Sequence, residues 1–185
     1  LIRKAYRDES VKALVLRVDS GGGSAYASEV IADELEKFKQ SGRPIVASMS
    51  SVAASGGYYI SAPADKIFAN HNTITGSIGV GGFIPTFERA LDQIGIHEDG
   101  YSTVDLTTSL FKTLTEKDKE IMQMGVDDIY IKFITKVAEG RSMSVEEVDA
   151  IARGRVWIGE KALEIGLVDE LGDIEDAILA AAERD

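Results

Sequence analysis

Two short glycine-rich segments contain the residues best suited to chemistry. DSGGGS at 19–24 has three consecutive glycines, and AASGG at 53–57 places Ser55 among alanines and glycines. Glycine has no Cβ, so another molecule can lie directly against the main chain. Each segment precedes a predicted helix, whose first N–H groups lack an intrahelical acceptor and attract an anion. The pattern predicts an anion site, either for a phosphate or for the oxyanion that forms when a serine attacks a carbonyl.

A nucleophilic serine needs a base, and this chain offers few candidates. It has no cysteine and only two histidines, His71 and His97, for which a turn or surface position is the simpler interpretation. The residues around Ser55 match neither the P-loop nor the G-x-S-x-G pattern of α/β-hydrolases. If Ser55 reacts, its base could be a lysine with a lowered pKa. The alternative is that Ser55 is only a turn or cap residue.

The elements that must position these segments form a strand, a helix and a second strand. The apolar runs at 11–20 and 44–50 predict buried strands. The segment 24–42 predicts a helix that Ser24 caps and Gly42 ends. Its apolar face is predicted to comprise Ala27, Ile31, Leu35 and Phe38. This order predicts a right-handed crossover and a parallel sheet.

The remaining sequence predicts more strands and helices in an α/β fold, with residues 1–185 forming a single domain. The predicted strands are at 66–70 and 77–82. The predicted helices are at 56–64, 85–95, 115–140, 144–154, 157–166 and 173–185. The segment 97–114 has no clear period and predicts a loop or an extended arm.

Composition excludes several classes of function. With 31 acidic and 20 basic residues the net charge is −11, which repels nucleic acid. No apolar run approaches the ~20 residues of a membrane-spanning helix. The absence of cysteine and the scarcity of histidine predict no metal site, and no cofactor is expected. Because the chain starts at Leu1 without methionine, we expect it to be a fragment of a longer protein.

Four motifs, in order along the whole chain, resemble the signal peptide peptidase A family (SppA, protease IV). They are RVDSGGGSAYASEVI, SMSSVAASGGYYIS, NTITGSIGV and GRVWIGEKALEIGLVDELG. The resemblance implies a serine peptidase with a Clp-protease/crotonase-like fold, in which ββα-type units build a parallel sheet with flanking helices. It implies that Ser55 is the nucleophile and that Gly56, with Gly22 or Gly23, supplies the N–H groups of an oxyanion hole. It also implies that Ser77 orients a catalytic lysine.

The sequence departs from the family pattern at two places. Gly21 stands where the family usually has proline, which loosens the loop but leaves its N–H donors in place. The position that aligns with the family's lysine lies near Gly100, and no lysine is there. The nearest lysines are Lys112, which is better interpreted as a solvated side chain, and Lys66, which lies in the predicted strand after Ser55. The chain therefore resembles the C-terminal half of a long-form enzyme, whose N-terminal half carries the lysine, and we expect the fragment alone to be nearly inert.

The resemblance also implies partners and a location. The expected substrates are cleaved, apolar signal peptides, and the expected assembly is a homo-oligomer that includes the homologous N-terminal half. The family implies a bacterial inner membrane location facing the periplasm, with an anchor outside this chain. Two alternatives stay open: a crotonase-type enzyme that holds an acyl-CoA enolate on the same glycine N–H groups, and a non-catalytic subunit that only builds the assembly.

Overall fold

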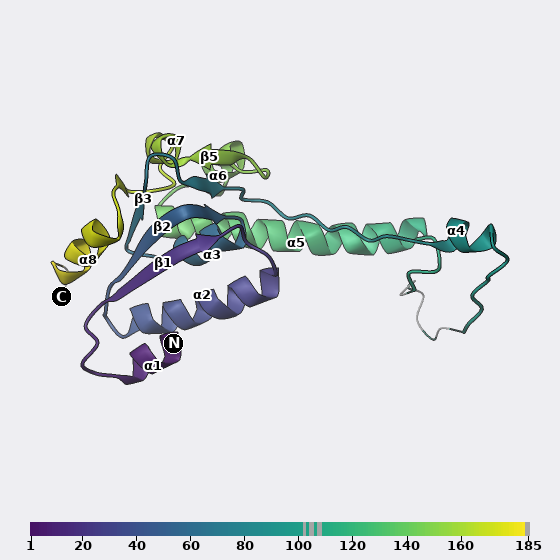
Figure 1. Ribbon diagram of the computed structural model, residues 1–185, viewed down its shortest axis with the longest axis horizontal. Helices are drawn as coiled ribbons and strands as arrows, with labels where there is room; N and C mark the ends of the chain where they lie inside the picture. The colour runs from purple at the N-terminus through teal and green to yellow at the C-terminus, as the bar shows by residue number, and fades with distance from the viewer. Residues whose placement is uncertain (102, 104–105, 107–108, 184–185) are drawn as a thin grey trace. The chain divides into compact units, whose positions relative to one another are not determined.

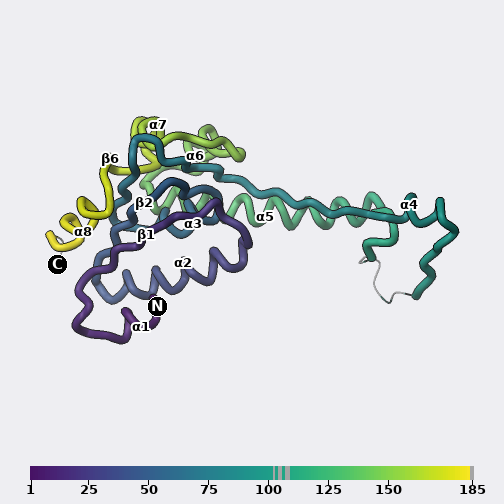
Figure 2. Tube along the Cα trace, in the orientation of Figure 1, coloured from purple at the N-terminus to yellow at the C-terminus, as the bar shows by residue number. Residues whose placement is uncertain are grey.

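The computed structural model describes residues 1–101, 103, 106 and 109–183 (Figures 1 and 2). These divide into two compact units, one formed by 1–79 with 131–185 and the other by 80–130. The single domain expected from the sequence stays a prediction. Within the described residues, no helix is both long and apolar enough to cross a membrane.

A six-stranded sheet organises the first unit, and its longest strand is central. The strands are β1 (Leu14–Ser20), β2 (Ile45–Ala54), β3 (Lys66–Ala69), β4 (Ile74–Gly76), β5 (Val156–Ile158) and β6 (Glu170–Leu171). One edge of β2 pairs with β1, while the other pairs first with β3 and then, near its C-terminal end, with β4. All pairs are parallel except β4 with β5. The carboxyl ends of β1, β2 and β4 therefore meet at one end of the sheet.

Helices cover both faces of this sheet (Figure 1). The helices of the chain are α1 (Ile2–Arg7), α2 (Ala25–Gln40), α3 (Gly56–Ser61), α4 (Glu88–Asp92), α5 (Glu116–Arg141), α6 (Val145–Ile151), α7 (Gly159–Glu164) and α8 (Ile174–Ala182). On one face, α8 buries Ala177, Ala180 and Ala181 against Val46 and Phe68. Helix α3 packs against β1, β2 and α2. The first unit is thus a mixed α/β structure, as its sequence predicts.

The predicted order of strand, helix and parallel strand before Ser55 is confirmed as β1, α2 and β2. In Figure 2 the chain leaves β1, returns along α2 and enters β2, and the two strands pair in parallel. Ser24 caps α2 by accepting a hydrogen bond from the N–H of Ala27 at 3.2 Å. The strand predicted at 44–50 continues to Ala54, so β2 runs directly into Ser55. At the start of α6, Ser144 and Glu147 form a capping box.

The predicted apolar face of α2 is wrong in its first half. Leu35 and Phe38 are buried, but Ala27 and Ile31 are exposed. The buried positions there are Ser28 and Ala32, because small side chains are needed where α2 packs closely against α3. The sequence period identified the helix but misplaced its buried side by one residue.

Three other predicted elements differ from the structure. The strand predicted at 77–82 is instead β4 at Ile74–Gly76, since positive φ angles at Gly76 (76°) and Ser77 (49°) end the extended backbone. The helix predicted at 157–166 starts later, because residues 156–158 pair with β4 as β5. The helix predicted at 85–95 is confined to α4. The segment predicted as a loop at 97–114 has no helix or strand where it is described, and residues 102, 104, 105, 107 and 108 lie outside the described residues.

The unit formed by 80–130 has its own internal contacts. The N–H of Phe87 donates to the carbonyl of Leu110 at 2.8 Å, and the N–H of Thr113 donates to the Glu88 carboxylate at 2.8 Å. Both bonds tie the segment before α5 to the start of α4. This unit contains Lys112 and His97.

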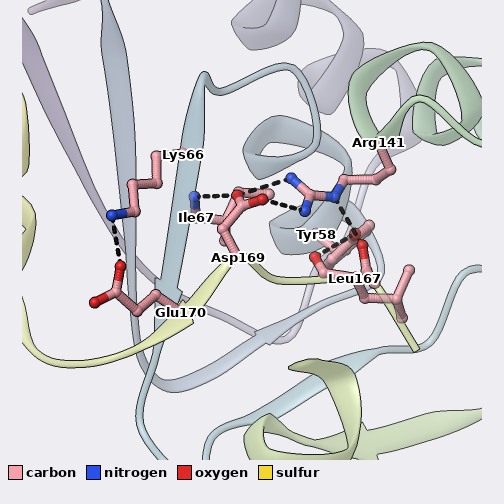
Figure 3. A network of polar contacts seen from close by, with 8 residues as sticks. Tyr58, Lys66, Ile67, Arg141, Leu167, Asp169 and Glu170 are labelled. Carbon is pink, nitrogen blue, oxygen red and sulfur yellow. Dashed lines mark hydrogen bonds and ion pairs between the residues drawn. The ribbon is translucent and has the colours of Figure 1, made fainter. Parts of the chain in front are cut away.

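A polar network fixes the C-terminal end of α5 in the first unit (Figure 3). The Arg141 guanidinium donates two hydrogen bonds to Asp169, at 2.6 and 2.9 Å, and a third to the carbonyl of Gly166 at 2.9 Å. Asp169 also accepts from the N–H of Ile67 at 2.7 Å. Burial alone would raise the pKa of the Asp169 carboxyl, but the hydrogen bonds and charge of Arg141 and the Ile67 N–H hold it below its usual value.

Replacing Asp169 with asparagine is expected to lower the free energy of unfolding at pH 7 by about 3 kcal/mol, since it leaves the Arg141 charge without its partner. Because the folded-state pKa of Asp169 lies below its unfolded value, its contribution is complete above about pH 4 and is lost as the pH falls through the folded pKa. Urea unfolding between pH 2.5 and 7 measures this. An unchanged acid dependence in the variant would contradict the assignment.

Replacing each of two glycines in α5 with alanine is expected to change the stability of the fold in opposite directions. A Cβ at Gly140 would collide with the carbonyl oxygen of Ala62, whereas a Cβ at Gly125 has nothing within 4 Å. We expect Gly140→Ala to destabilise the fold by about 1–3 kcal/mol through overpacking. Gly125→Ala should stabilise it by up to about 1 kcal/mol through helix propensity. Thermal melts of both variants test this, and similar shifts in the same direction would be inconsistent with the packing.

Candidate active site

Ser55 occupies a strained position between β2 and α3. Its φ of 53° and ψ of −120° lie outside the regions that L-residues ordinarily adopt. The conformation is held because its N–H donates to the carbonyl of Gly76 at 2.9 Å and its carbonyl accepts from the N–H of Tyr59 at 2.9 Å. The Ser55 side chain makes no helix-capping hydrogen bond and is half-buried. Strain of this kind concentrates at functional sites, which disfavours the interpretation of Ser55 as a simple cap.

The glycine-rich loop after β1 lies directly against Ser55. A Cβ built on Gly22 would stand 2.7 Å from both the Gly56 nitrogen and the Ser55 Cβ, and 3.0 Å from the carbonyl oxygen of Ala54. Gly22 also has a φ of 97°, so glycine is required there for space and for conformation. The structure therefore brings together the two glycine-rich segments that the sequence singled out.

The main-chain N–H groups of Gly22, Gly23 and Gly56 lie where the glycine-rich loop meets Ser55. The N–H of Gly22 donates to the Ser20 hydroxyl at 3.1 Å. Within the part of the chain that the structure describes, the N–H groups of Gly23 and Gly56 have no hydrogen-bond acceptor. A Cβ on Gly56 would lie only 3.4 Å from the Gly23 nitrogen, so these two donors are neighbours. They can together bind one anionic oxygen next to Ser55.

Two serines that were not predicted as site residues, Ser20 and Ser28, pack against Gly57 and Gly56 next to Ser55. Besides accepting from Gly22, Ser20 places its carbonyl oxygen 2.5 Å from where a Cβ on Gly57 would be. The Ser28 hydroxyl lies 2.5 Å from the corresponding position on Gly56 and donates to the carbonyl of Ser24 at 3.1 Å. The position of Ser20 directly before three glycines could have identified it from the sequence. Ser28 could not be identified in this way, because whether its side chain faces Gly56 depends on the rotation of α2 about its axis.

Ser77 lies beside Ser55 through the pairing of β4 with β2. Gly76, which accepts the Ser55 N–H, immediately precedes it. Ser77 has a φ of 49°, and its own N–H donates to the carbonyl of Arg155 at 2.7 Å. The residue is half-buried. Ser77 is therefore the second strained serine at this end of the sheet.

The candidate bases within the first unit point elsewhere. His71 is exposed, and its imidazole lies 3.8 Å from the Glu160 carboxylate. Lys66 pairs with Glu170 at 2.5 Å and lies next to Val46, at the opposite end of β2 from Ser55. From position 46 to position 55 a strand extends roughly 30 Å, which excludes Lys66 as the base. In the other unit, the imidazole of His97 contacts Asp92 at 3.1 Å.

Tyrosines of α3 anchor the helix that follows Ser55. The hydroxyl of the fully buried Tyr58 donates to the carbonyl of Leu167 at 2.7 Å (Figure 3), and burial raises the pKa of this phenol. Tyr59 donates to the Glu29 carboxylate of α2, and the Lys136 ammonium of α5 lies 5.4 Å from its ring centre. These contacts fix α3, and with it the Gly56 N–H, relative to the sheet.

Comparison with known proteins identifies the family of this chain. Residues 37–185 match the model of peptidase family S49. The chain is 47% identical over 184 residues to Protease 4 of Haemophilus influenzae and 50% identical over 183 residues to Protease 4 of Salmonella typhi. It is 35% identical over 186 residues to the chloroplastic serine protease SPPA of Arabidopsis thaliana. These matches cover 98–99% of this chain but only 30%, 30% and 27% of the respective relatives. The chain belongs to peptidase family S49.

Proposed function

We propose that this chain supplies the nucleophile and the oxyanion hole of a serine peptidase. The observation that carries the proposal is the strained Ser55 with two free N–H groups, those of Gly23 and Gly56, beside it. Of the two loop donors implied by the family resemblance, Gly23 is favoured, since the N–H of Gly22 is already bound to Ser20. Family membership and the names of the relatives support the same activity.

The base is proposed to be a lysine that a second, homologous domain brings to Ser55. The relatives are more than three times as long as this chain, so their polypeptides have room for such a domain. In the first step the neutral lysine amine removes the Ser55 proton while Oγ attacks a peptide carbonyl carbon. The N–H groups of Gly23 and Gly56 bind the resulting oxyanion. The lysine ammonium then protonates the leaving amine, and an acyl-enzyme ester on Ser55 remains.

Water completes the cycle by the reverse sequence. Water attacks the ester carbon while the lysine amine takes a proton from that water. The bond from the ester carbon to Ser55 Oγ then breaks, and Oγ receives this proton from the lysine ammonium. The lysine must be neutral at working pH, so a desolvated position that lowers its pKa is required. Ser77, adjacent to Gly76 and strained, is proposed to hold this amine by a hydrogen bond from the side chain.

The proposed substrates are cleaved signal peptides, which are apolar and extended. Small residues on both sides of Ser55 (Ala53, Ala54, Gly56 and Gly57) leave room for a peptide main chain to lie as an added strand. The same family relationship is the basis for proposing a Clp-protease/crotonase-like fold, a homo-oligomer, and attachment to the periplasmic side of the bacterial inner membrane by an anchor outside this chain.

A fluorophosphonate probe tests the proposal directly. In the assembly that includes the lysine-bearing domain, we expect covalent labelling of Ser55, located by mass spectrometry of the tryptic peptide. Labelling should disappear in Ser55→Ala and persist in Ser51→Ala, which removes an exposed hydroxyl of the same strand. A folded wild-type assembly without labelling would favour an acyl-CoA enzyme or a non-catalytic subunit instead.

A further inference from the structure

The fourth motif of the sequence, which includes residues 154–157, supplies no group to the proposed reaction. It nevertheless forms main-chain hydrogen bonds with Ser77 and Ile78. The carbonyl of Arg155 accepts the Ser77 N–H at 2.7 Å, and the N–H of Gly154 donates to the carbonyl of Ile78 at 2.8 Å. A Cβ on Gly79 would stand 2.8 Å from the Gly154 nitrogen, so the two segments are in close contact. These bonds hold the main chain of Ser77 at its positive φ.

The side chain of Trp157 packs on the residue that binds the Ser55 N–H. A Cβ on Gly76 would lie 2.8 Å from Cδ1 of the indole and 3.1 Å from the carbonyl oxygen of Arg155. The Gly76 carbonyl in turn accepts the Ser55 N–H at 2.9 Å. A single carbonyl therefore links the indole to the strained backbone of the proposed nucleophile.

The end of α6 fixes the motif itself. The indole N–H of Trp157 donates to the carbonyl of Ile151 at 3.0 Å. The Arg155 guanidinium donates to the carbonyls of Ala150 at 2.7 Å and Ala152 at 3.3 Å. Ala150 and Ile151 belong to the last turn of α6 and Ala152 is its C-cap, where a helix leaves its carbonyls without intrahelical donors. Arg155 and Trp157 thus use the end of α6 as a fixed support.

We infer that Arg155 and Trp157 are positioning residues for the proposed peptidase site. Through Gly76 they set the backbone of Ser55, and through the Arg155 carbonyl they set Ser77. The inference rests on the proposed function. It assigns the GRVW segment a role in the geometry of the reaction, beyond its contribution to the sheet.

The test compares three variants in the assembly with the lysine-bearing domain. Trp157→Ala removes the packing and the indole bond, and Trp157→Phe keeps an aromatic ring on Gly76. Ile158→Ala is the control, because this neighbouring side chain of β5 is 49% exposed. Since a displacement of about 1 Å can cost about 100-fold in rate, we expect Trp157→Ala to lower kcat and the rate of fluorophosphonate labelling by about 30–100-fold. KM should stay within about twofold, because substrate binding does not use the indole.

Trp157→Phe and Ile158→Ala distinguish a positioning role of Trp157 from a general effect on the stability of the fold. Trp157→Phe should recover most of the lost kcat, and Ile158→Ala should match the wild type. Equal labelling rates in Trp157→Ala and wild type would overturn the inference, as would a loss in kcat no greater than in Ile158→Ala. If Trp157→Ala does not fold, Arg155→Ala is tested in its place, since this variant keeps the main-chain carbonyl that binds Ser77. We expect Arg155→Ala to lower kcat by about tenfold. Absence of labelling in the wild type would instead reject the proposed function.

Discussion

Replacing Ser55 with alanine is expected to lower kcat for peptide hydrolysis by at least about 10,000-fold in the proposed assembly with a lysine-bearing domain. In the proposed reaction the Ser55 Oγ forms the acyl-enzyme ester, and alanine has no oxygen to form that bond. KM should change little, because alanine leaves the loop and the peptide-facing main chain in position. Steady-state hydrolysis of a quenched apolar peptide measures both constants.

Ser51→Ala provides the matched control for this loss. It removes the same hydroxyl from an exposed position of β2, four residues before Ser55. We expect its kcat to equal that of the wild type. Retention of activity in Ser55→Ala, or an equal loss in both variants, would be incompatible with Ser55 as the nucleophile.

Gly22→Ala is expected to lower kcat by about 100–1,000-fold, as large as the loss of an oxyanion-hole donor. The added Cβ would stand 2.7 Å from both the Gly56 nitrogen and the Ser55 Cβ, so the loop must move away and take the Gly23 N–H with it. The φ of 97° adds backbone strain that favours the same movement. The decrease should appear in kcat, because the donors act on the oxyanion and not on the bound substrate.

Gly21→Ala separates crowding at the site from a general effect on the loop. A Cβ on Gly21 has nothing within 4 Å, and its φ is not positive. Its kcat should therefore stay within about threefold of the wild type, the range of an exposed substitution without new contacts. If Gly21→Ala and Gly22→Ala lost activity equally, the close approach of Gly22 to Ser55 would not explain the effect.

The parts of the fold that sequence predicted well are those determined by local signals. The period of α2, its Ser24 cap and the apolar runs around it were sufficient to predict the parallel pairing of β1 with β2. β4 was misplaced because its three residues are held by long-range pairing with β2 and β5. The short strand β5 was assigned to a helix for the same reason. Short elements carry too little local preference to decide their own structure.

The candidate site shows a similar division. Ser55 and the glycines of both loops stand out by residue type, and the structure brings them together. Which N–H groups are free could not be predicted, because that depends on the Ser20 side chain turning toward Gly22. The support that Trp157 gives to Gly76 joins residues 81 positions apart and becomes visible only once the strands are paired.

We propose that Ser55 reacts only when an amine from another domain reaches it. The most direct measurement compares peptide hydrolysis by this chain alone with hydrolysis by the same chain after the lysine-bearing domain is added. We predict that the isolated chain, although folded, is slower by at least about 1,000-fold, and that the added domain restores activity in wild type but not in Ser55→Ala. Hydrolysis at the full rate by the isolated chain would show that Ser55 does not need an amine from another domain.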